Sequence, residues 1–254
     1  KFYIGDIRDR SSVDDAMSGV DYVFHAAALK QVPTCEFFPM QATQTNVLGS
    51  RNVIDSAISH GVFKVVSLST DKAVYPVNAL GITKALMEKM VEASARNLGE
   101  GETVLTLVRY GNVLFSRGSV IPLFMKQIKE NNAISVTEPE MTRFLLPLKV
   151  AIDLVSFALE KGRQGDIFVR KAPSCLIGDL AQAVKNIFRS NSEIKTIGMR
   201  HGEKMYETLA SKGELLRSED MGDYLRINID DRDLNYNKYL NEGDMKIIKT
   251  EDYN

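Results

Sequence analysis

The sequence predicts an α/β fold, a doubly wound parallel sheet with a smaller interleaved lobe. Short β-branched apolar runs alternate along the chain with longer runs that carry apolar residues at helical spacing. The lengths and order of these runs are those of βαβ units, which bring parallel strands into one sheet through right-handed crossovers. The chain has 254 residues, 44% of them hydrophobic, which is enough for a sizeable core. We therefore expect functional residues beyond the carboxyl ends of the strands.

Strands are expected in four runs. The opening run, 1–9, is predicted to be a strand with Asp6 at its end. The next three are apolar on both faces, as in a parallel sheet covered from both sides, and they span 20–27, 63–70 and 103–113. The polar segments that follow these strands are the first candidates for a ligand site.

Helices are expected between and after these strands. Residues 45–61 and 81–99 carry apolar side chains at helical spacing, and they end at Gly61 and Gly99, which are common helix stops. Two later helices are predicted at 119–130 and 150–162.

The character of the chain changes after about Ser116. The predicted strands become short, the connections become long, and 217–244 is polar and loop-rich. We therefore expect a main, cofactor-binding domain over residues 1–115. Residues 116–254 are expected to form mainly a substrate-binding lobe that is interleaved with it.

Composition excludes several classes of partner. The formal net charge is −1 and the pI is about 6.4, so no basic surface for nucleic acid or an anionic membrane is expected. The two cysteines, Cys35 and Cys175, match no metal-ligand spacing and fit a reduced protein. No run of about 18 apolar residues is present, and the opening residues lack the order of a signal peptide. We expect a cytoplasmic protein with no metal site and no membrane span.

An acid and a base stand side by side where the run 63–70 ends. Asp71 and Lys72 occupy this position, in STDKAVYP. Neighbouring groups at a strand end can have their pKa values pushed apart, as general acid–base chemistry requires. A solvated turn that holds a chance Asp–Lys pair is an equal alternative on this pattern alone.

A glycine-rich turn is not found near residue 1. A dinucleotide-binding sheet normally begins with a strand, such a turn and a helix, which together hold the pyrophosphate. Neither GxxGxxG nor GxGxxG occurs near the start of the chain. We expect two strand–helix units, about 60 residues in all, to precede Lys1 and to carry that turn.

Many segments of the chain together resemble a known family. They are GDIRD, HAAALKQVP, TNVLGSRNV, STDKAVYPVNALGITKALMEK, RYGNVLFSRGSVIPLF, MTRF, GDIFVRKAP and RHGEKMYETL. In this order they resemble the UDP-N-acetylglucosamine 4,6-dehydratases of the extended short-chain dehydrogenase/reductase superfamily. Within that family they are most similar to the inverting, capsule-type dehydratase/5-epimerases of bacterial polysaccharide synthesis. The resemblance spans Phe2 to Asn254.

This resemblance implies a Rossmann-like fold whose N-terminal strands are missing here, and a family sequence that continues past both ends of the chain. It also implies NADP as the cofactor and UDP-N-acetylglucosamine as the substrate. A homo-oligomer is expected.

The same resemblance assigns roles to four residues. Oxidising C4 of the hexose to a ketone makes the C5 hydrogen acidic, so that water can leave across C5 and C6, while NADP takes the C4 hydride and returns it to C6. By resemblance, Asp71 is the acid for the C6 hydroxyl, and Lys72 handles the C5 proton. Thr70 hydrogen-bonds the C4 oxygen, and Lys84 hydrogen-bonds the nicotinamide ribose.

Leu80 stands four positions before Lys84, where the superfamily has a tyrosine on the same helix face. The capsule-type branch tends to have an apolar residue there, so Leu80 fits that branch. It leaves the acceptor of the C4 hydroxyl proton open among Lys84, Thr70 and a bound water. Tyr75 is the nearest phenol, but it precedes Pro76 in a predicted turn, and a structural role is preferred for it.

Further polar positions divide between cofactor and substrate. Asp6 is expected to accept a hydrogen bond from the adenine amine, and the backbone of Ala26, Ala27 and Ala28 to lie along the cofactor. Close strand packing is a second, compatible interpretation of these alanines, and Asn46 is expected to be structural. Contacts to the sugar or diphosphate are expected from Lys30, Asn112, Arg117, Arg143, Arg200 and Glu203. Guanidinium forks match phosphate oxygens, although a lone arginine or lysine is also a common surface charge.

Two other functions stay open. A binding module for a nucleotide sugar or dinucleotide, without turnover, would explain Leu80 and the missing glycine-rich turn. A nucleotide-sugar 4-epimerase depends on the tyrosine that is absent here and has no need of the Asp–Lys pair. The presence of Asp71, Lys72 and Lys84 favours the dehydratase.

Overall fold

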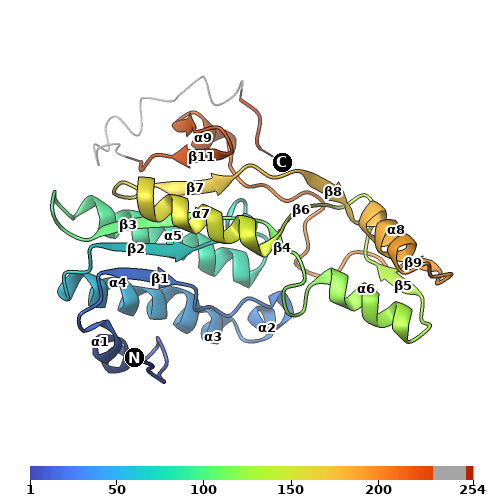
Figure 1. Ribbon diagram of the computed structural model, residues 1–254, viewed down its shortest axis with the longest axis horizontal. Helices are drawn as coiled ribbons and strands as arrows, with labels where there is room; N and C mark the ends of the chain where they lie inside the picture. Colours follow the sequence, from blue (N-terminus) through green and yellow to red (C-terminus); the bar gives the residue numbers. More distant parts are fainter. Residues whose placement is uncertain (231–249, 254) are drawn as a thin grey trace.

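The structure, a computed structural model, describes residues 1–230 and 250–253 and centres on a six-stranded sheet of order β1-β2-β3-β7-β11-β10 (Figure 1). The parallel strands are β1 (Tyr22–His25), β2 (Lys64–Leu68), β3 (Val104–Arg109) and β7 (Ile167–Arg170). The antiparallel strands are β11 (Tyr224–Ile227) and β10 (Ser218–Asp220). The predicted α/β class with a mainly parallel sheet is confirmed.

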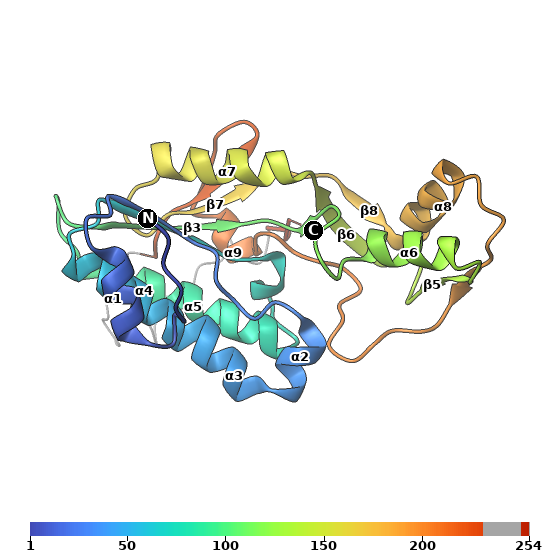
Figure 2. The same cartoon turned by 60° about the horizontal axis from the view of Figure 1, so that its bottom comes forward.

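Helices cover both faces of this sheet (Figure 2). One face carries α1 (Arg10–Met17), α4 (Ser50–Ser59) and α5 (Ala79–Arg96), and the other carries α7 (Leu148–Lys161). Successive strand residues point to opposite faces. Val65 therefore packs in the core that contains Met87 of α5, whereas Val66 packs in the core that contains Leu154 of α7. Burial on both faces explains why β2 and β3 are continuous apolar runs.

The helix predicted at 45–61 begins with a π-helix, Gln44–Gly49, which continues into α4. Asn46 lies in the π-helix and is fully buried. Its side-chain amide accepts from the backbone N of Leu29 at 2.8 Å and donates to the Leu29 carbonyl at 3.0 Å and to Thr83 Oγ1 at 3.0 Å. Asn46 thus fixes the chain that leaves β1, in agreement with a structural role. Two short helices precede it, α2 (Val32–Phe37) and α3 (Pro39–Thr43).

A second, smaller lobe lies beyond the carboxyl ends of the parallel strands (Figure 1). Its helices are α6 (Val120–Lys129) and α8 (Ile177–Ile187), and its strands are β4 (Asn112–Val113), β5 (Ile134–Val136), β6 (Thr142–Leu146), β8 (Ser174–Leu176) and β9 (Ile194–Thr196). Phe124 and Met141 are fully buried in a core separate from that of the main sheet. The chain returns from this lobe to the sheet through α7 and β7, and again through β10 and β11. The helices predicted at 119–130 and 150–162 are confirmed as α6 and α7.

One sequence-based prediction is wrong, and a second is tested only in part. Residues 2–5 form no strand, and Phe2 and Ile4 are 90% and 93% exposed. A strand needs a neighbour for its N–H and C=O groups, and among the described residues β1 pairs only with β2. The segment 217–244, expected to be loop-rich, contributes the β10–β11 hairpin, whose turn uses Gly222 at φ 78°. Residues 231–244 of that segment lie outside the described part.

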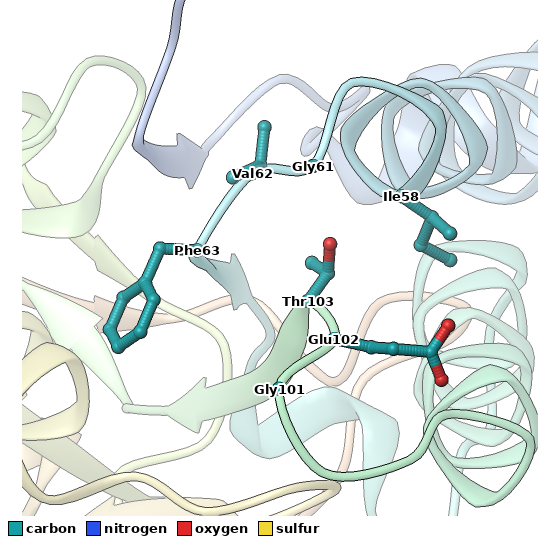
Figure 3. A pocket seen from close by; sticks show the side chains of 7 residues that line it. All are labelled: Ile58, Gly61, Val62, Phe63, Gly101, Glu102 and Thr103. Atoms are coloured by element: carbon teal, nitrogen blue, oxygen red, sulfur yellow. The ribbon is translucent and has the colours of Figure 1, made fainter.

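A pocket of about 270 Å³ lies at the amino ends of β2 and β3 (Figure 3). Its lining residues are Ile58, Gly61, Val62, Phe63, Gly101, Glu102 and Thr103. Phe63 directly precedes β2 and Thr103 directly precedes β3, so this pocket and the predicted site residues that follow β2 lie at opposite ends of the strands. A search for helices long and apolar enough to cross a bilayer finds none in residues 1–230 and 250–253.

Candidate active site

The Thr70–Lys72 segment turns sharply where β2 ends, in a short 3₁₀-helix over Asp71–Ala73. Thr70 begins this helix, and its hydroxyl accepts from the backbone N of Lys72 at 3.4 Å. Backbone bonds from Ser69 to Val108 at 2.8 Å and from Asp71 to Tyr110 at 3.3 Å tie the turn to the end of β3. The predicted acid and base are therefore held at the carboxyl edge of the sheet.

Asp71 is fully buried, which contradicts the alternative of a solvated turn. Its Oδ1 accepts from Thr70 Oγ1 at 2.8 Å and from Lys72 Nζ at 3.0 Å. Its Oδ2 is also buried but has no hydrogen-bond partner among the described residues. Buried polar atoms are nearly always paired, so this oxygen is the one expected to meet a bound ligand.

Lys72 lies among charged groups from three parts of the chain. Its Nζ is 3.0 Å from Asp71 Oδ1 and 3.5 Å from Glu207 Oε1. Burial opposes the charge on Lys72, but the two carboxylates outweigh burial and the repulsion of Arg143, so the pKa of Lys72 is raised above its ordinary value. The resting group is an ammonium at neutral pH.

Lys84 is buried on α5, one turn from Leu80, and donates to the carbonyl of Leu68 at 2.9 Å. Burial lowers the pKa of Lys84 from 10.5 to about 8, although Glu88 acts in the opposite direction. His25 at the end of β1 is also buried, and burial together with the charge of Lys84 lowers its pKa to about 4. Lys84 thus reaches the end of β2, beside a histidine that is neutral at physiological pH.

Gly81 brings α5 against the Thr70–Lys72 turn. A Cβ added to Gly81 would collide with the carbonyl oxygen of Lys72 and would contact Pro76 at 3.1 Å. Asn78 fixes the start of the helix, since its side chain accepts from the backbone N of Gly81 at 2.8 Å. The close approach requires glycine in GITK and holds α5, the helix that carries Lys84, against the turn that carries Asp71 and Lys72.

Leu80 is buried in a small apolar cluster with Cys35 and Ala42. Tyr75 lies in the left-handed region, at φ 47°, and its hydroxyl donates to Asp252 Oδ1 at 2.9 Å. This bond ties the turn to the end of the described chain, as a structural role for Tyr75 requires.

Of the residues expected to bind the cofactor, the three alanines lie where a ligand could reach them, whereas Asp6 is paired with Arg8. Ala26 and Ala27 are exposed directly beyond β1, and Ala28 is half-buried, so their backbone is open to a ligand. Asp6 does not follow a strand, and its carboxylate is paired with Arg8, with 2.6 Å between Oδ2 and Nη2. Arg8 lowers the pKa of Asp6 to about 2.

The expected substrate residues fall into two groups. Lys30 and Arg117 come together, since Lys30 Nζ donates to the carbonyl of Arg117 at 2.9 Å, and Arg143 is close enough to affect Lys72. Arg200 and Glu203 lie in a local turn, where the backbone N of Arg200 donates to Glu203 Oε2 at 3.1 Å. The side-chain Oδ1 of Asn112 is buried and has no partner in the described part of the chain.

Two buried groups were not among the sequence-based candidates. Glu207 contacts Lys72 and lies within RHGEKMYETL. The two residues are so far apart in the sequence that no motif or periodicity predicts their contact. Arg109, at the end of β3, is bound by Glu88 of α5 at 2.7 Å and by Glu214 at 2.8 Å. Glu214 belongs to the short helix α9 (Lys212–Leu215). The only sequence signal for Arg109 was its place at a strand end, in RYGN.

Comparisons with known proteins agree with this architecture. A family model described as polysaccharide biosynthesis protein matches residues 1–229, and a C-terminal model of the same description matches 230–254. A protein of Rickettsia felis named UDP-glucose 4-epimerase is 60% identical over 254 residues, which is 100% of this chain and 74% of the relative.

Two solved structures extend the comparison. Pen from Bacillus thuringiensis has a TM-score of 0.86 and 42% identity, and the match covers 89% of this chain and 72% of Pen. DesIV, a dTDP-glucose 4,6-dehydratase from Streptomyces venezuelae with NAD bound, has a TM-score of 0.74 at 21% identity, over 81% of this chain and 69% of DesIV. The DesIV match shows the fold alone. This chain belongs to the polysaccharide biosynthesis protein family, within the extended short-chain dehydrogenase/reductase superfamily.

Proposed function

We propose that the protein is an NADP-dependent UDP-N-acetylglucosamine 4,6-dehydratase that inverts C5 and supplies a 4-keto-6-deoxy sugar nucleotide for bacterial surface polysaccharide. The observation that carries this proposal is the buried Asp71–Lys72 pair beyond β2, whose Asp71 Oδ2 has no partner among the described residues. A dehydration needs an acid and a base beside the same two carbon atoms. The pair supplies both on one turn.

The pair also holds the number of protons that dehydration requires. In the ion pair, the ammonium of Lys72 has one proton that it can give up, and this proton can pass to Asp71 along the 3.0 Å hydrogen bond between the two side chains. Its transfer leaves a neutral amine and a neutral carboxylic acid. The amine takes the C5 proton, and the acid protonates the C6 hydroxyl as it leaves as water.

Residues at the strand ends fit a nicotinamide cofactor. The backbone of Ala26 to Ala28 is accessible beyond β1, and the buried hydroxyls of Ser67 and Ser69 have no partner within the described residues. The cofactor, when bound, supplies the hydride acceptor and donor. Lys84 would hold its ribose. Asp6 would accept a hydrogen bond from the adenine once one of its hydrogen bonds from Arg8 is broken. NADP is our proposal, while the DesIV relative binds NAD.

The substrate would lie between the main sheet and the smaller lobe. Lys30, Arg117 and Arg143 are proposed to bind its sugar and diphosphate, because ammonium and guanidinium groups match phosphate oxygens. Lys30 lies beside Arg117, and the charge of Arg143 acts on Lys72. Asn112 and Arg200 are proposed as further contacts, and Glu203 as the group that shapes the Arg200 turn. The protein would act in the cytoplasm, where nucleotide sugars are made.

A 4-epimerase is the second candidate, because the relative from Rickettsia felis carries that name. Leu80, buried among apolar side chains, offers no phenol for the reversible oxidation at C4. Incubation of the protein with NADP and either UDP-N-acetylglucosamine or UDP-glucose separates the two functions. A 4-keto-6-deoxy product supports dehydration, whereas a 4-epimer without loss of water supports epimerisation. Binding without turnover would indicate a binding module.

Replacing Lys84 with Ala is expected to weaken cofactor binding and turnover together, because the ammonium near the end of β2 is lost. Leu80→Tyr serves as the companion variant. It should keep dehydratase activity and lose about 1–3 kcal/mol of stability, since a larger ring enters a packed cluster. Calorimetry with NADP and single-turnover rates measure both. Full activity in Lys84→Ala would refute the ribose role, and an inactive Leu80→Tyr with an unchanged melting curve would show that the leucine itself is needed.

We also propose a homo-oligomer. Leu48, Ile82 and Leu86 are each more than half exposed, on the π-helix and on the adjacent outer face of α5. Leu86→Glu is expected to shift the protein toward the monomer, because a charge in an apolar contact is costly. Light scattering after gel filtration gives the mass. Ile187→Glu, on α8, is the control, and an unchanged mass in Leu86→Glu would place the contact elsewhere.

A further inference from the structure

Glu207 packs against the Asp71–Lys72 pair from a distant part of the chain. It is only 2% exposed, with its Oε1 3.5 Å from Lys72 Nζ and its Oε2 3.5 Å from Lys204 Nζ. Lys204 is itself anchored, since it donates to the carbonyl of Val74 at 2.5 Å. A buried carboxylate is costly unless cations compensate it, and here two lysines do so.

The segment around Glu207 is fixed at both ends. The backbone N of Thr142 donates to the carbonyl of Met205 at 2.9 Å, and the guanidinium of Arg143 donates to the carbonyl of Lys204 at 3.0 Å. On the other side, the guanidinium of Arg109 donates to the carbonyl of Leu209 at 3.3 Å. The backbone that carries Glu207 is therefore anchored, and burial together with the ion pairs to Lys72 and Lys204 holds its charge in place. Such preorganised charges are the ones that stabilise a developing charge most effectively.

Among the described residues, three charged groups act on Lys72 directly, and Lys204 acts on one of them, Glu207. Asp71 comes from the same turn, Glu207 and Lys204 come from the anchored segment, and Arg143 comes from β6. Asp71 already shares a proton with Lys72, so its charge disappears when that proton moves across. Glu207 is then the anion that remains beside the amine.

We propose that Glu207 is a positioning residue for Lys72, which holds the amine toward the substrate and stabilises the ammonium that forms when Lys72 takes the C5 proton. The inference rests on the proposed function. In this step the C5–H bond breaks and an N–H bond forms on Lys72, while the electron pair enters the enolate of the C4 ketone. The C6–O bond then breaks as Asp71 gives its proton to the leaving oxygen, which departs as water.

The test is Glu207→Gln, which keeps the shape of the side chain and removes its charge. Competitive acetylation of the full protein with acetic anhydride, read by peptide mass spectrometry across pH, reports the neutral fraction of each lysine. We expect the midpoint for Lys72 to fall by about 1–3 pH units, the range for loss of one opposite charge at this distance. Lys126, whose side chain is 71% exposed, is the internal reference and should not move.

Glu92→Gln is the matched control, because Glu92 is an equally buried carboxylate, 2.8 Å from Lys89, on the far part of α5. It should leave the Lys72 midpoint unchanged. An unchanged midpoint in Glu207→Gln would overturn the inference.

A second readout uses the reaction itself. Exchange of the C5 hydrogen of UDP-N-acetylglucosamine with deuterium oxide should show the same downward shift of its pH profile in Glu207→Gln, with a rate at the plateau roughly 10-fold or more lower. A shifted labelling midpoint in a protein that forms no 4-keto sugar would overturn the proposed function and leave Glu207 as the group that holds Lys72. A normal profile and plateau in Glu207→Gln would overturn the role in catalysis.

Discussion

Asp71→Asn is expected to stop dehydration after oxidation, yet still to allow the C5 hydrogen of the substrate to exchange with deuterium oxide. Without the charge of Asp71 the Lys72 ammonium gives up its proton to solvent more readily, so an amine base is still available beside the ketone, whereas the acid for the C6 hydroxyl is gone. Lys72→Ala should instead suppress the exchange. Each change should lower the rate of dehydration roughly 10²–10⁴-fold, equivalent to about 3–6 kcal/mol of barrier at about 1.4 kcal/mol per tenfold. Mass spectrometry of the recovered sugar nucleotide measures exchange, and chromatography measures product.

The stereochemistry of the product provides an independent check on this assignment. The C5 configuration should be inverted in the wild type, because a proton removed from one face and returned to the other cannot restore the original centre. Glu92→Gln, far from the turn, is the control for nonspecific loss of activity. Lys72→Ala with exchange and inversion at the wild-type rate would show that another group handles the C5 proton.

Arg109→Met is expected to destabilise the fold by about 3–5 kcal/mol, the cost of breaking a buried ion cluster by removing one member. Arg109 is 3% exposed and is the cation for both Glu88 and Glu214. Without it, the buried carboxylate of Glu88 and the largely buried carboxylate of Glu214 both lose their cation between β3, α5 and α9. The urea midpoint at pH 7 should fall accordingly.

The pH dependence of this loss tests its electrostatic origin. Burial acts to raise the pKa of Glu214, but the guanidinium of Arg109 outweighs it and lowers the pKa from 4.5 to about 2. In the wild type this carboxylate stabilises the fold fully above about pH 4.5, and the contribution is lost as the pH falls toward 2. The difference between wild type and Arg109→Met should therefore shrink below pH 4.5.

A matched variant separates charge from packing at the same place. Arg109→Met combined with Glu88→Leu and Glu214→Leu removes all three charges and should recover most of the lost stability, because a buried ion cluster is replaced by apolar side chains. A difference that stays constant with pH, or a triple variant as unstable as the single one, would assign the loss to packing alone.

The alternation of strands and helices was readable from the sequence because its cause is local. The β-branched runs of β2 and β3 and the helical spacing of α5 depend on residues a few positions apart, so the sheet core and the turn that carries Asp71 and Lys72 could be placed by pattern. Asp71 and Lys72 were identified for the same reason, as neighbours at a strand end. Whether they lie in water or in the core was not decided by that pattern.

The partners of these groups were decided only by tertiary structure. Asp71 is buried because α5 packs against its turn through Gly81, and Lys72 meets Glu207 because a segment far along the chain returns to the sheet. The run around Phe2, apolar enough for a strand, has no strand neighbour within residues 1–230 and 250–253 to satisfy its backbone and stays exposed. The periodicity of apolar residues predicts which face of a helix or strand is buried. It does not predict which group lies beside a buried charge, because that depends on contacts between distant segments whose sequences share no pattern.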